Sequence, residues 1–97
     1  MAFKIIETYT RTSPSTKWYQ YPADHAAIIN TLIGEKKMDL QTATSPNRIV
    51  QTVTVIFNTK EEWDSVINNP LLVSNFTARD EYNAAHNIIK EIAVTEI

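Results

Sequence analysis

The stretch IVQTVTVIFNTKEEW, residues 49–63, decides the fold because it carries a clear step from a strand to a helix. Residues 49–58 are rich in β-branched side chains and predict a strand. Thr59 then stands at the N-cap position of a helix, and Glu62 completes a capping-box pattern three residues later. When the chain is followed outward from this step, its apolar periodicity predicts the element order β-α-β-β-α-β.

Three elements are predicted before this step. Alternating apolar residues in Phe3–Thr10 predict the first strand. Pro22 suits the first turn of a helix, and Gly34, the only glycine in the chain, is expected to end that helix in a left-handed conformation. The second strand is predicted at Met38–Thr44, and a turn at residues 45–48 joins it to the third strand.

Two helices and a strand are predicted from the step onward. The Asn69-Pro70 pair is expected to end the first of these helices, because the residue before a proline avoids helical backbone angles. Residues 71–76 predict an apolar connector, and Thr77 predicts the N-cap of the next helix. Asn87 is expected to provide a left-handed exit from that helix, and residues 88–97 predict the last strand, which is apolar on both faces.

These elements predict a single α+β domain over residues 1–97. Two β-α-β halves joined by a hairpin are typical of a ferredoxin-like antiparallel sheet with its helices on one face. Right-handed crossovers place the first and third strands at the centre of such a sheet and the other two at its edges. The chain length agrees with one domain.

The face of the sheet that points away from the helices is predicted to be rich in threonine. Such a face is neither apolar enough for a core nor charged enough for a typical solvated surface, so we expect it to pack against a second copy of the chain. The alternative is a monomer, since threonine is a normal residue of exposed strands. The candidate dimer-face residues are Thr8, Val50, Thr52, Thr54 and Ile56.

The predicted topology resembles that of the dimeric α+β barrel superfamily over essentially the whole chain. The segments FKIIETYTR (residues 3–11), DHAAII (24–29) and RDEYNAAHNI (79–88) also resemble small uncharacterised proteins of marine cyanophages. The first resemblance implies a relation to small monooxygenases, isomerases and haem-handling enzymes, whose sites lie in a cleft between sheet and helices. The second implies a phage-encoded protein. No motif of these enzymes transfers residue by residue to this chain.

Composition excludes several classes of function. The formal net charge is −2, with 9 basic and 11 acidic residues spread evenly, so no basic surface marks a nucleic-acid or membrane partner. Because the chain has no cysteine, disulfides, iron–sulfur clusters and thiol catalysis are excluded. No apolar run approaches the ~20 residues that a membrane span requires. We therefore expect a cytoplasmic protein, in the host cytoplasm if a phage encodes it.

Aromatic and histidine residues near the helix ends are the candidates for a ligand cleft. They can line a pocket, but the aromatic residues suit a core or a helix staple equally well, and both histidines suit a surface position or a helix end. Neither histidine belongs to a metal-binding pattern, and no cofactor signature is found. Arg79 is interpreted as part of a solvated helix start. The ligand-cleft candidates are Trp18, Tyr21, His25, Tyr82 and His86.

Two functions from different classes compete on this basis. The absence of a catalytic motif favours a small non-enzymatic, homodimeric interaction or accessory protein. The alternative is a cofactor-independent enzyme of the monooxygenase or isomerase kind, or a small-molecule binder, with its site between sheet and helices. The superfamily resemblance implies this alternative, although fold analogy alone is a weak guide to function.

Overall fold

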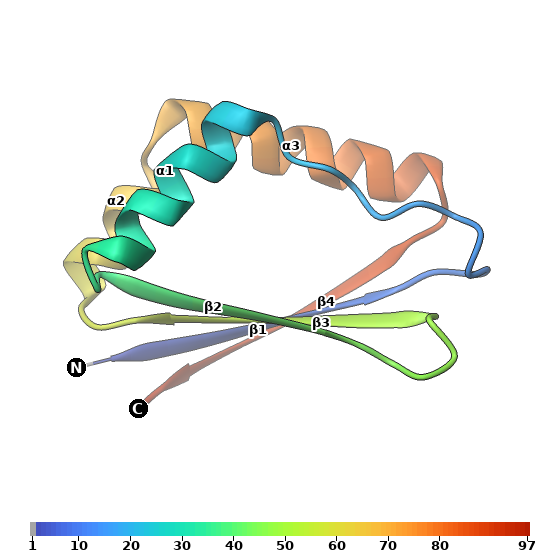
Figure 1. Ribbon diagram of the computed structural model, residues 1–97, viewed down its shortest axis with the longest axis horizontal. Coiled ribbons are helices and arrows are strands. Elements are labelled where there is room, and N and C mark those ends of the chain that lie inside the picture. Colours follow the sequence, from blue (N-terminus) through green and yellow to red (C-terminus); the bar gives the residue numbers. More distant parts are fainter. Residues whose placement is uncertain (1) are drawn as a thin grey trace.

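The computed structural model describes residues 2–97 and contains one four-stranded sheet with its helices on one side (Figure 1). The strands are β1 (Phe3–Thr10), β2 (Met38–Thr44), β3 (Val50–Phe57) and β4 (Ile89–Glu96). The helices are α1 (Ala23–Gly34), α2 (Lys60–Ile67) and α3 (Pro70–Ala85). No helix within this part of the chain has the length and apolar character needed to cross a membrane.

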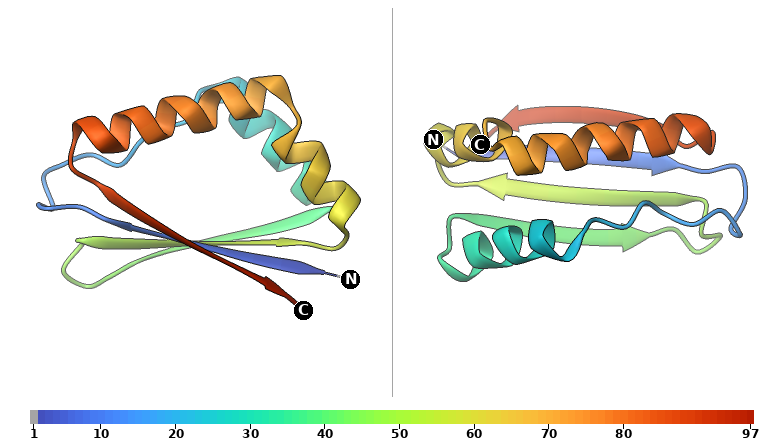
Figure 2. Two further views of the ribbon diagram at one scale, coloured as in Figure 1. Left: turned by 180° about the vertical axis from the view of Figure 1, so that it is seen from behind. Right: turned by 90° about the horizontal axis from the view of Figure 1, so that it is seen from above.

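The strands pair in the order β2-β3-β1-β4, and every pair is antiparallel. The first and third strands are therefore central, and all helices cover the same face (Figure 2), as the predicted ferredoxin-like α+β fold requires. Backbone hydrogen bonds between Ala2 and Ile97, of 3.3 and 2.9 Å, continue the pairing of β1 with β4. The two ends of the described chain consequently lie side by side.

Helix α2 begins as its sequence predicts. The Thr59 hydroxyl oxygen accepts a hydrogen bond from the Glu62 backbone N–H at 3.2 Å, which satisfies one of the free donors at the helix start. The reciprocal half of the capping box is not formed: within residues 2–97, the Glu62 Oε2 atom is buried without a hydrogen-bond partner. The cap alone therefore fixes the strand-to-helix step.

The predicted start of the last helix at Thr77 is wrong. Helix α3 begins at Pro70, directly after α2, and the Asn69 side chain caps it by accepting hydrogen bonds from the N–H groups of Leu71 and Leu72. A proline that ends one helix suits the first position of the next, because its fixed φ angle is helical. An N–H group at this position would have no partner within the helix, so its absence costs nothing. Thr77 lies inside α3, where its hydroxyl donates to the Val73 carbonyl at 3.1 Å.

The predicted left-handed position of Gly34 is also wrong. Gly34 is the last residue of α1 and has no positive φ angle, whereas Lys36 has a φ angle of 61°. The Lys36 N–H donates to Ile33 and the Lys37 N–H donates to Leu32, which is the Schellman pattern of helix termination. The prediction for Asn87 is confirmed, since its φ angle is 57° at the end of α3.

A compact apolar cluster joins one end of the sheet to the helices. Leu72 at its centre is only 1% exposed, and Trp63 stacks against Phe57 at its margin. The buried members of the cluster are Ile5, Met38, Val55, Phe57, Val66 and Leu72. This cluster fills only part of the space beneath the helices.

None of the helices in residues 2–97 covers the opposite face of the sheet. Thr8 pairs with Thr52 across β1 and β3, and their neighbours on this face are Val50, Thr54 and Ile56. The edge strand β4 exposes apolar side chains on both of its faces. Their exposed fractions are 62% for Ile89, 58% for Ile92 and 49% for Val94, and Ile97, directly after the strand, is 58% exposed.

Candidate functional site

A cavity of about 440 Å³ lies between the sheet and the helices, and inward-facing residues of all four strands line it. The cavity exists because α3 turns polar residues toward the sheet. Asn75, Arg79 and Asn83, spaced four residues apart, share one face of this helix and are all buried. A helix with apolar residues at these positions would close down on the sheet as a dry core.

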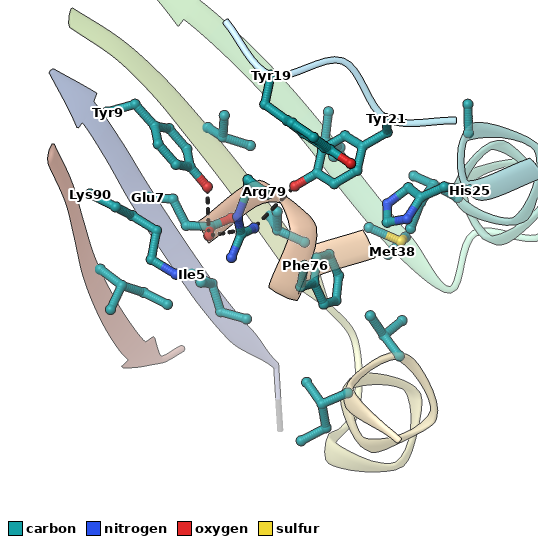
Figure 3. Close-up of a pocket in the computed structure, with 18 of the residues that line it drawn as sticks. Ile5, Glu7, Tyr9, Tyr19, Tyr21, His25, Met38, Phe76, Arg79 and Lys90 are labelled. Atoms are coloured by element: carbon teal, nitrogen blue, oxygen red, sulfur yellow. Dashed lines mark hydrogen bonds and ion pairs between the residues drawn. The ribbon is translucent and has the colours of Figure 1, made fainter. Parts of the chain in front are cut away.

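Arg79 forms the centre of a hydrogen-bonded cluster in this cavity (Figure 3). Its Nη1 atom donates to the Glu7 carboxylate at 3.3 Å and to the Tyr21 hydroxyl at 3.0 Å, and its Nε atom donates to Asp80 at 3.2 Å. The Tyr9 hydroxyl donates to the same Glu7 oxygen at 2.9 Å. The side chains of Arg79 and Glu7 are only 9% and 14% exposed, so this is a buried ion pair.

The cluster holds its members in defined protonation states. Burial opposes the charge of Arg79, but the neighbouring Tyr21, Tyr9 and Glu7 outweigh that effect and raise its pKa, so the guanidinium stays cationic. Burial, together with the negative charge of Glu7, raises the pKa of the Tyr9 phenol. Burial also raises the pKa of Tyr21, against the opposing effect of Arg79. Both phenols are therefore hydrogen-bond donors at neutral pH.

His25 lies in the same cavity, in the first turn of α1, and is only 4% exposed. Its ring stacks on Tyr21 with 4.1 Å between ring centroids, and the Phe76 ring meets it edge-on at 5.4 Å. Its Nδ1 atom lies 3.1 Å from the Asn75 Nδ2 atom. His25 therefore lies at a helix end, as one of its two interpretations had it, but it is buried and not on the surface, because this helix start faces inward.

The chemistry of His25 follows from these contacts. Burial lowers the pKa of its imidazole, Asp24 partly opposes that shift and Arg79 reinforces it, so the ring is neutral at neutral pH. As the Asn75 amide lies, its NH2 group donates to His25 Nδ1, and the imidazole proton is then on Nε2. If the amide is turned by about 180°, its oxygen accepts from Nδ1–H, and Nε2 has no proton. Within residues 2–97, no side chain or carbonyl bonds Nε2. Nε2 is thus free to exchange a proton with a molecule in the cavity.

Lowering the pH is expected to weaken the fold through His25. The pKa of His25 in the folded protein lies below its ordinary value of 6.5, so between those two values the unfolded chain binds more protons than the folded protein. The free energy of unfolding should therefore fall as the pH drops below about 6.5. Urea unfolding across this range measures the slope.

The two histidines provide a matched pair for this measurement. His25→Gln should remove the part of the slope that comes from the buried imidazole, whereas His86→Gln should keep it, because His86 is exposed. An unchanged slope in His25→Gln would show that other groups cause the acid sensitivity.

The structure brings three of the five ligand-cleft candidates together. Trp18, Tyr21 and His25 line the cavity, and Tyr21, which is 36% exposed, also borders solvent. Tyr82 and His86 are not among the lining residues and stack on each other with 4.0 Å between centroids. The Tyr82 hydroxyl donates to the Lys17 carbonyl at 2.6 Å, which ties the segment before α1 to α3. All five residues remain predictions as ligand contacts.

Sequence reasoning missed the charged half of the cavity. The interpretation of Arg79 as part of a solvated helix start is wrong, because α3 begins nine residues earlier, at Pro70, and Arg79 is buried. Glu7 carried an overlooked signal: it occupies the same strand face as Ile5 and Tyr9, and a carboxylate on a buried face requires a partner. Within residues 2–97, no group of three or more His, Cys, Asp or Glu residues is arranged to hold a metal ion.

Solved structures with this topology share little of the sequence. A proposed antibiotic biosynthesis monooxygenase from Deinococcus radiodurans matches with a TM-score of 0.56 and 12% identity, over 100% of this chain and 92% of that one. SnoaB, a cofactor-independent oxygenase from Streptomyces nogalater, matches with a TM-score of 0.54 and 9% identity, over 99% and 92% of the two chains. A dimeric ferredoxin-like protein from an uncultured marine organism matches with a TM-score of 0.55 and 9% identity, over 99% and 94%.

No protein-family model and no curated protein matches the chain. An origin in a phage stays a prediction. At identities this low, a structural match establishes the fold, and the reaction has to be argued from the site. The chain has a ferredoxin-like fold, as its order of strands and helices predicted.

Proposed function

We propose that this protein binds a small, largely apolar molecule in the cavity between sheet and helices and acts on it as a cofactor-independent enzyme. The observation that carries the proposal is the cavity itself. Its volume of about 440 Å³ falls within the range of ligand pockets, roughly 300–1,000 Å³. It combines aromatic and aliphatic walls with a few buried polar groups, as such pockets do.

His25 is the group that we propose for proton transfer. When the Asn75 amide oxygen accepts from Nδ1–H, the unpaired Nε2 can remove a proton from a bound molecule; with the amide as it lies, Nε2–H can donate one. Stacking on Tyr21 holds the ring plane, so the free nitrogen keeps one direction. The cationic Arg79, in the same cavity, would stabilise negative charge that develops on the molecule after proton removal.

The structural neighbours support an enzyme over the non-enzymatic interaction protein that the absence of motifs favoured. SnoaB is a cofactor-independent oxygenase, and the Deinococcus protein is a proposed monooxygenase. We take from them only the reaction class, because the same fold serves many functions. A cytoplasmic location belongs to this proposal.

Tryptophan fluorescence provides the first test, since Trp18 and Trp63 both line the cavity. A panel of small aromatic and polyketide-like compounds should contain molecules that change the emission in a saturable way. Those that bind are then incubated with the protein while oxygen uptake and product formation are measured. We expect turnover of at least one binder without added cofactor.

His25→Gln and His86→Gln separate catalysis from binding. His25→Gln should lower turnover about 10²–10⁴-fold, the usual contribution of an acid–base group, while binding changes little. His86→Gln should leave turnover unchanged, because His86 lies outside the cavity lining. If no compound binds, the proposed site is wrong; if compounds bind but His25→Gln retains full turnover, the assigned role of His25 is wrong.

We also propose that the working unit is a homodimer that buries the outer face of the sheet. No helix lies over this face, which carries Val50 and Ile56 among its threonines. The apolar residues of β4 are about half exposed or more on both sides of the strand, which is typical of a strand that a partner covers. One structural neighbour is described as dimeric.

Ile56→Lys is expected to produce a folded monomer, because a lysine in the centre of the proposed interface would bury an unpaired charge. Native mass spectrometry of the wild type and the variant measures the change. Val73→Lys is the matched control, since Val73 is 40% exposed on α3 and lies on the helical side of the sheet. A monomeric wild-type protein at micromolar concentration would contradict the dimer.

A further inference from the structure

The hydrogen bonds of the cavity leave Tyr21 with an unused proton. An arginine can only donate, so the Tyr21 hydroxyl oxygen accepts the 3.0 Å bond from Arg79 Nη1. The phenolic proton of Tyr21 is therefore not engaged in that bond, and no acceptor for it is found within residues 2–97. Tyr9 differs, because its proton is donated to Glu7. Tyr21 is a donor that borders both the cavity and the solvent.

Arg79 and Asn83, both on α3, add further donors without a partner among the described residues. The Arg79 bonds to Glu7, Tyr21 and Asp80 use Nη1 and Nε, and Nη2 has no partner in the described part of the chain. Asn83 stands one helical turn further along α3, lines the same cavity and is 5% exposed. Its Nδ2 atom is fully enclosed and has no hydrogen-bond partner within residues 2–97.

A buried donor without an acceptor is costly, and folded proteins rarely keep one unless a water or a ligand supplies the acceptor. Asn83 Nδ2 is such a donor, and the free donors of Arg79 Nη2 and Tyr21, which are not enclosed, belong to residues that line the same cavity. The charged residues that line the cavity are Arg79, Lys90 and Glu7, and Asp80, beside the cavity, pairs with Arg79 at 3.2 Å and with Lys90 at 3.4 Å. This surplus of donors favours a ligand that brings acceptor oxygens, and an anionic acceptor forms the strongest hydrogen bonds to a guanidinium such as that of Arg79.

The apolar part of the cavity adds a constraint on shape. The rings of Tyr21, His25 and Phe76 lie together on one side, with Tyr21 and His25 nearly parallel at 13°. Flat aromatic faces prefer flat partners. We propose that the ligand of this cavity is a planar molecule with a carboxylate or enolate group, whose oxygens accept hydrogen bonds from Arg79, Asn83 and Tyr21. This inference rests on the proposed function, because it takes the cavity to be a ligand site.

A pair of probes that differ in one small group, an anionic carboxylate or a neutral carboxamide, tests the inference. Calorimetric titration of the wild-type protein with 2-naphthoate and with 2-naphthamide compares an anionic and a neutral group on the same flat ring. We expect 2-naphthoate to bind at least about tenfold more tightly, since a hydrogen bond to a charged group contributes that much or more. The preference for 2-naphthoate should weaken only slightly when salt is added, because salt screens buried charges much less than exposed ones.

Two variants locate the anion. Asn83→Leu and Tyr21→Phe each remove one donor and keep the approximate shape of the side chain, so each should weaken 2-naphthoate binding about tenfold and 2-naphthamide binding less, because the amide oxygen is a neutral acceptor. Thermal unfolding checks that both variants are folded. Thr77→Val, which removes an exposed hydroxyl from the same helix outside the cavity, should change neither affinity.

The possible outcomes separate this inference from the proposed function. Equal affinity for the two probes would overturn the anionic ligand and leave the cavity as a binding site. A preference for 2-naphthoate that survives both Asn83→Leu and Tyr21→Phe would put the anion elsewhere and also overturn the inference. If neither probe binds and the wider fluorescence panel finds no binder, the proposed function fails, and this inference fails with it.

Discussion

Arg79→Met is expected to lower the free energy of unfolding by about 3–5 kcal/mol, the usual cost of breaking a buried ion pair from one side. The reason is the Glu7 carboxylate, which is 14% exposed and would keep only the hydrogen bond from Tyr9 among the described residues. A small domain has a total stability of roughly 5–15 kcal/mol, so the loss should be plain in urea unfolding followed by circular dichroism.

The double variant Glu7→Gln, Arg79→Met is the informative control. When both charges are removed together, no uncompensated charge remains in the cavity, so most of the lost stability should return. Lys60→Met should cost little, because its ion pair with Asp64 is exposed on α2. If Arg79→Met alone costs no more than Lys60→Met, the ion pair does not stabilise the fold and Arg79 is retained for ligand contact only.

Leu72→Ala is expected to lower the free energy of unfolding by about 2–5 kcal/mol, the range seen when a buried leucine is truncated. Leu72 is 1% exposed and belongs to the cluster that joins α3 to the sheet. Truncation of its side chain leaves an apolar void, whose walls lose their packing contacts and do not hold a water molecule. Thermal and urea unfolding of the variant measure the loss.

Leu71→Ala is a close control for Leu72→Ala. Leu71 is the neighbour of Leu72 on the same helix, has the same side chain, and is 37% exposed. The same truncation should cost about 1 kcal/mol or less at this position, because the side chain already contacts solvent. Comparable losses in the two variants would mean that α3 is rotated relative to the sheet from the arrangement described here.

The strands of the sheet were accessible from sequence because they depend on local patterns. Alternation in Phe3–Thr10 and the β-branched run before Thr59 place the central strands, and a single turn links β2 to β3. The bounds of β1 and β2 agree with the prediction at both ends. When one face of a strand is buried, apolar and polar residues alternate along the sequence with a period of two, which differs from the period of about 3.6 in a helix.

The candidate site was less accessible because it depends on contacts between distant residues. Glu7 and Arg79 are 72 positions apart, and His25 and Asn75 are 50 positions apart. The polar inner face of α3 also hides the helix from an apolar periodicity search, which is why Thr77 rather than Asn69 was interpreted as its start. A buried polar face is visible in sequence only when its partner is already known.

The paired ends of the chain have a practical consequence for experiments on this protein. Ala2 and Ile97 exchange backbone hydrogen bonds at the end of β1 where Phe3 lies, whereas the segment that leads to Tyr21 leaves from the other end, after Thr10 (Figure 1). A fluorescent reporter or a surface tether fused at either end of the described chain would therefore extend from the same corner, opposite the end of β1 from which the segment with Tyr21 leaves. Immobilised protein should keep the solvent-exposed part of Tyr21 accessible to dissolved compounds.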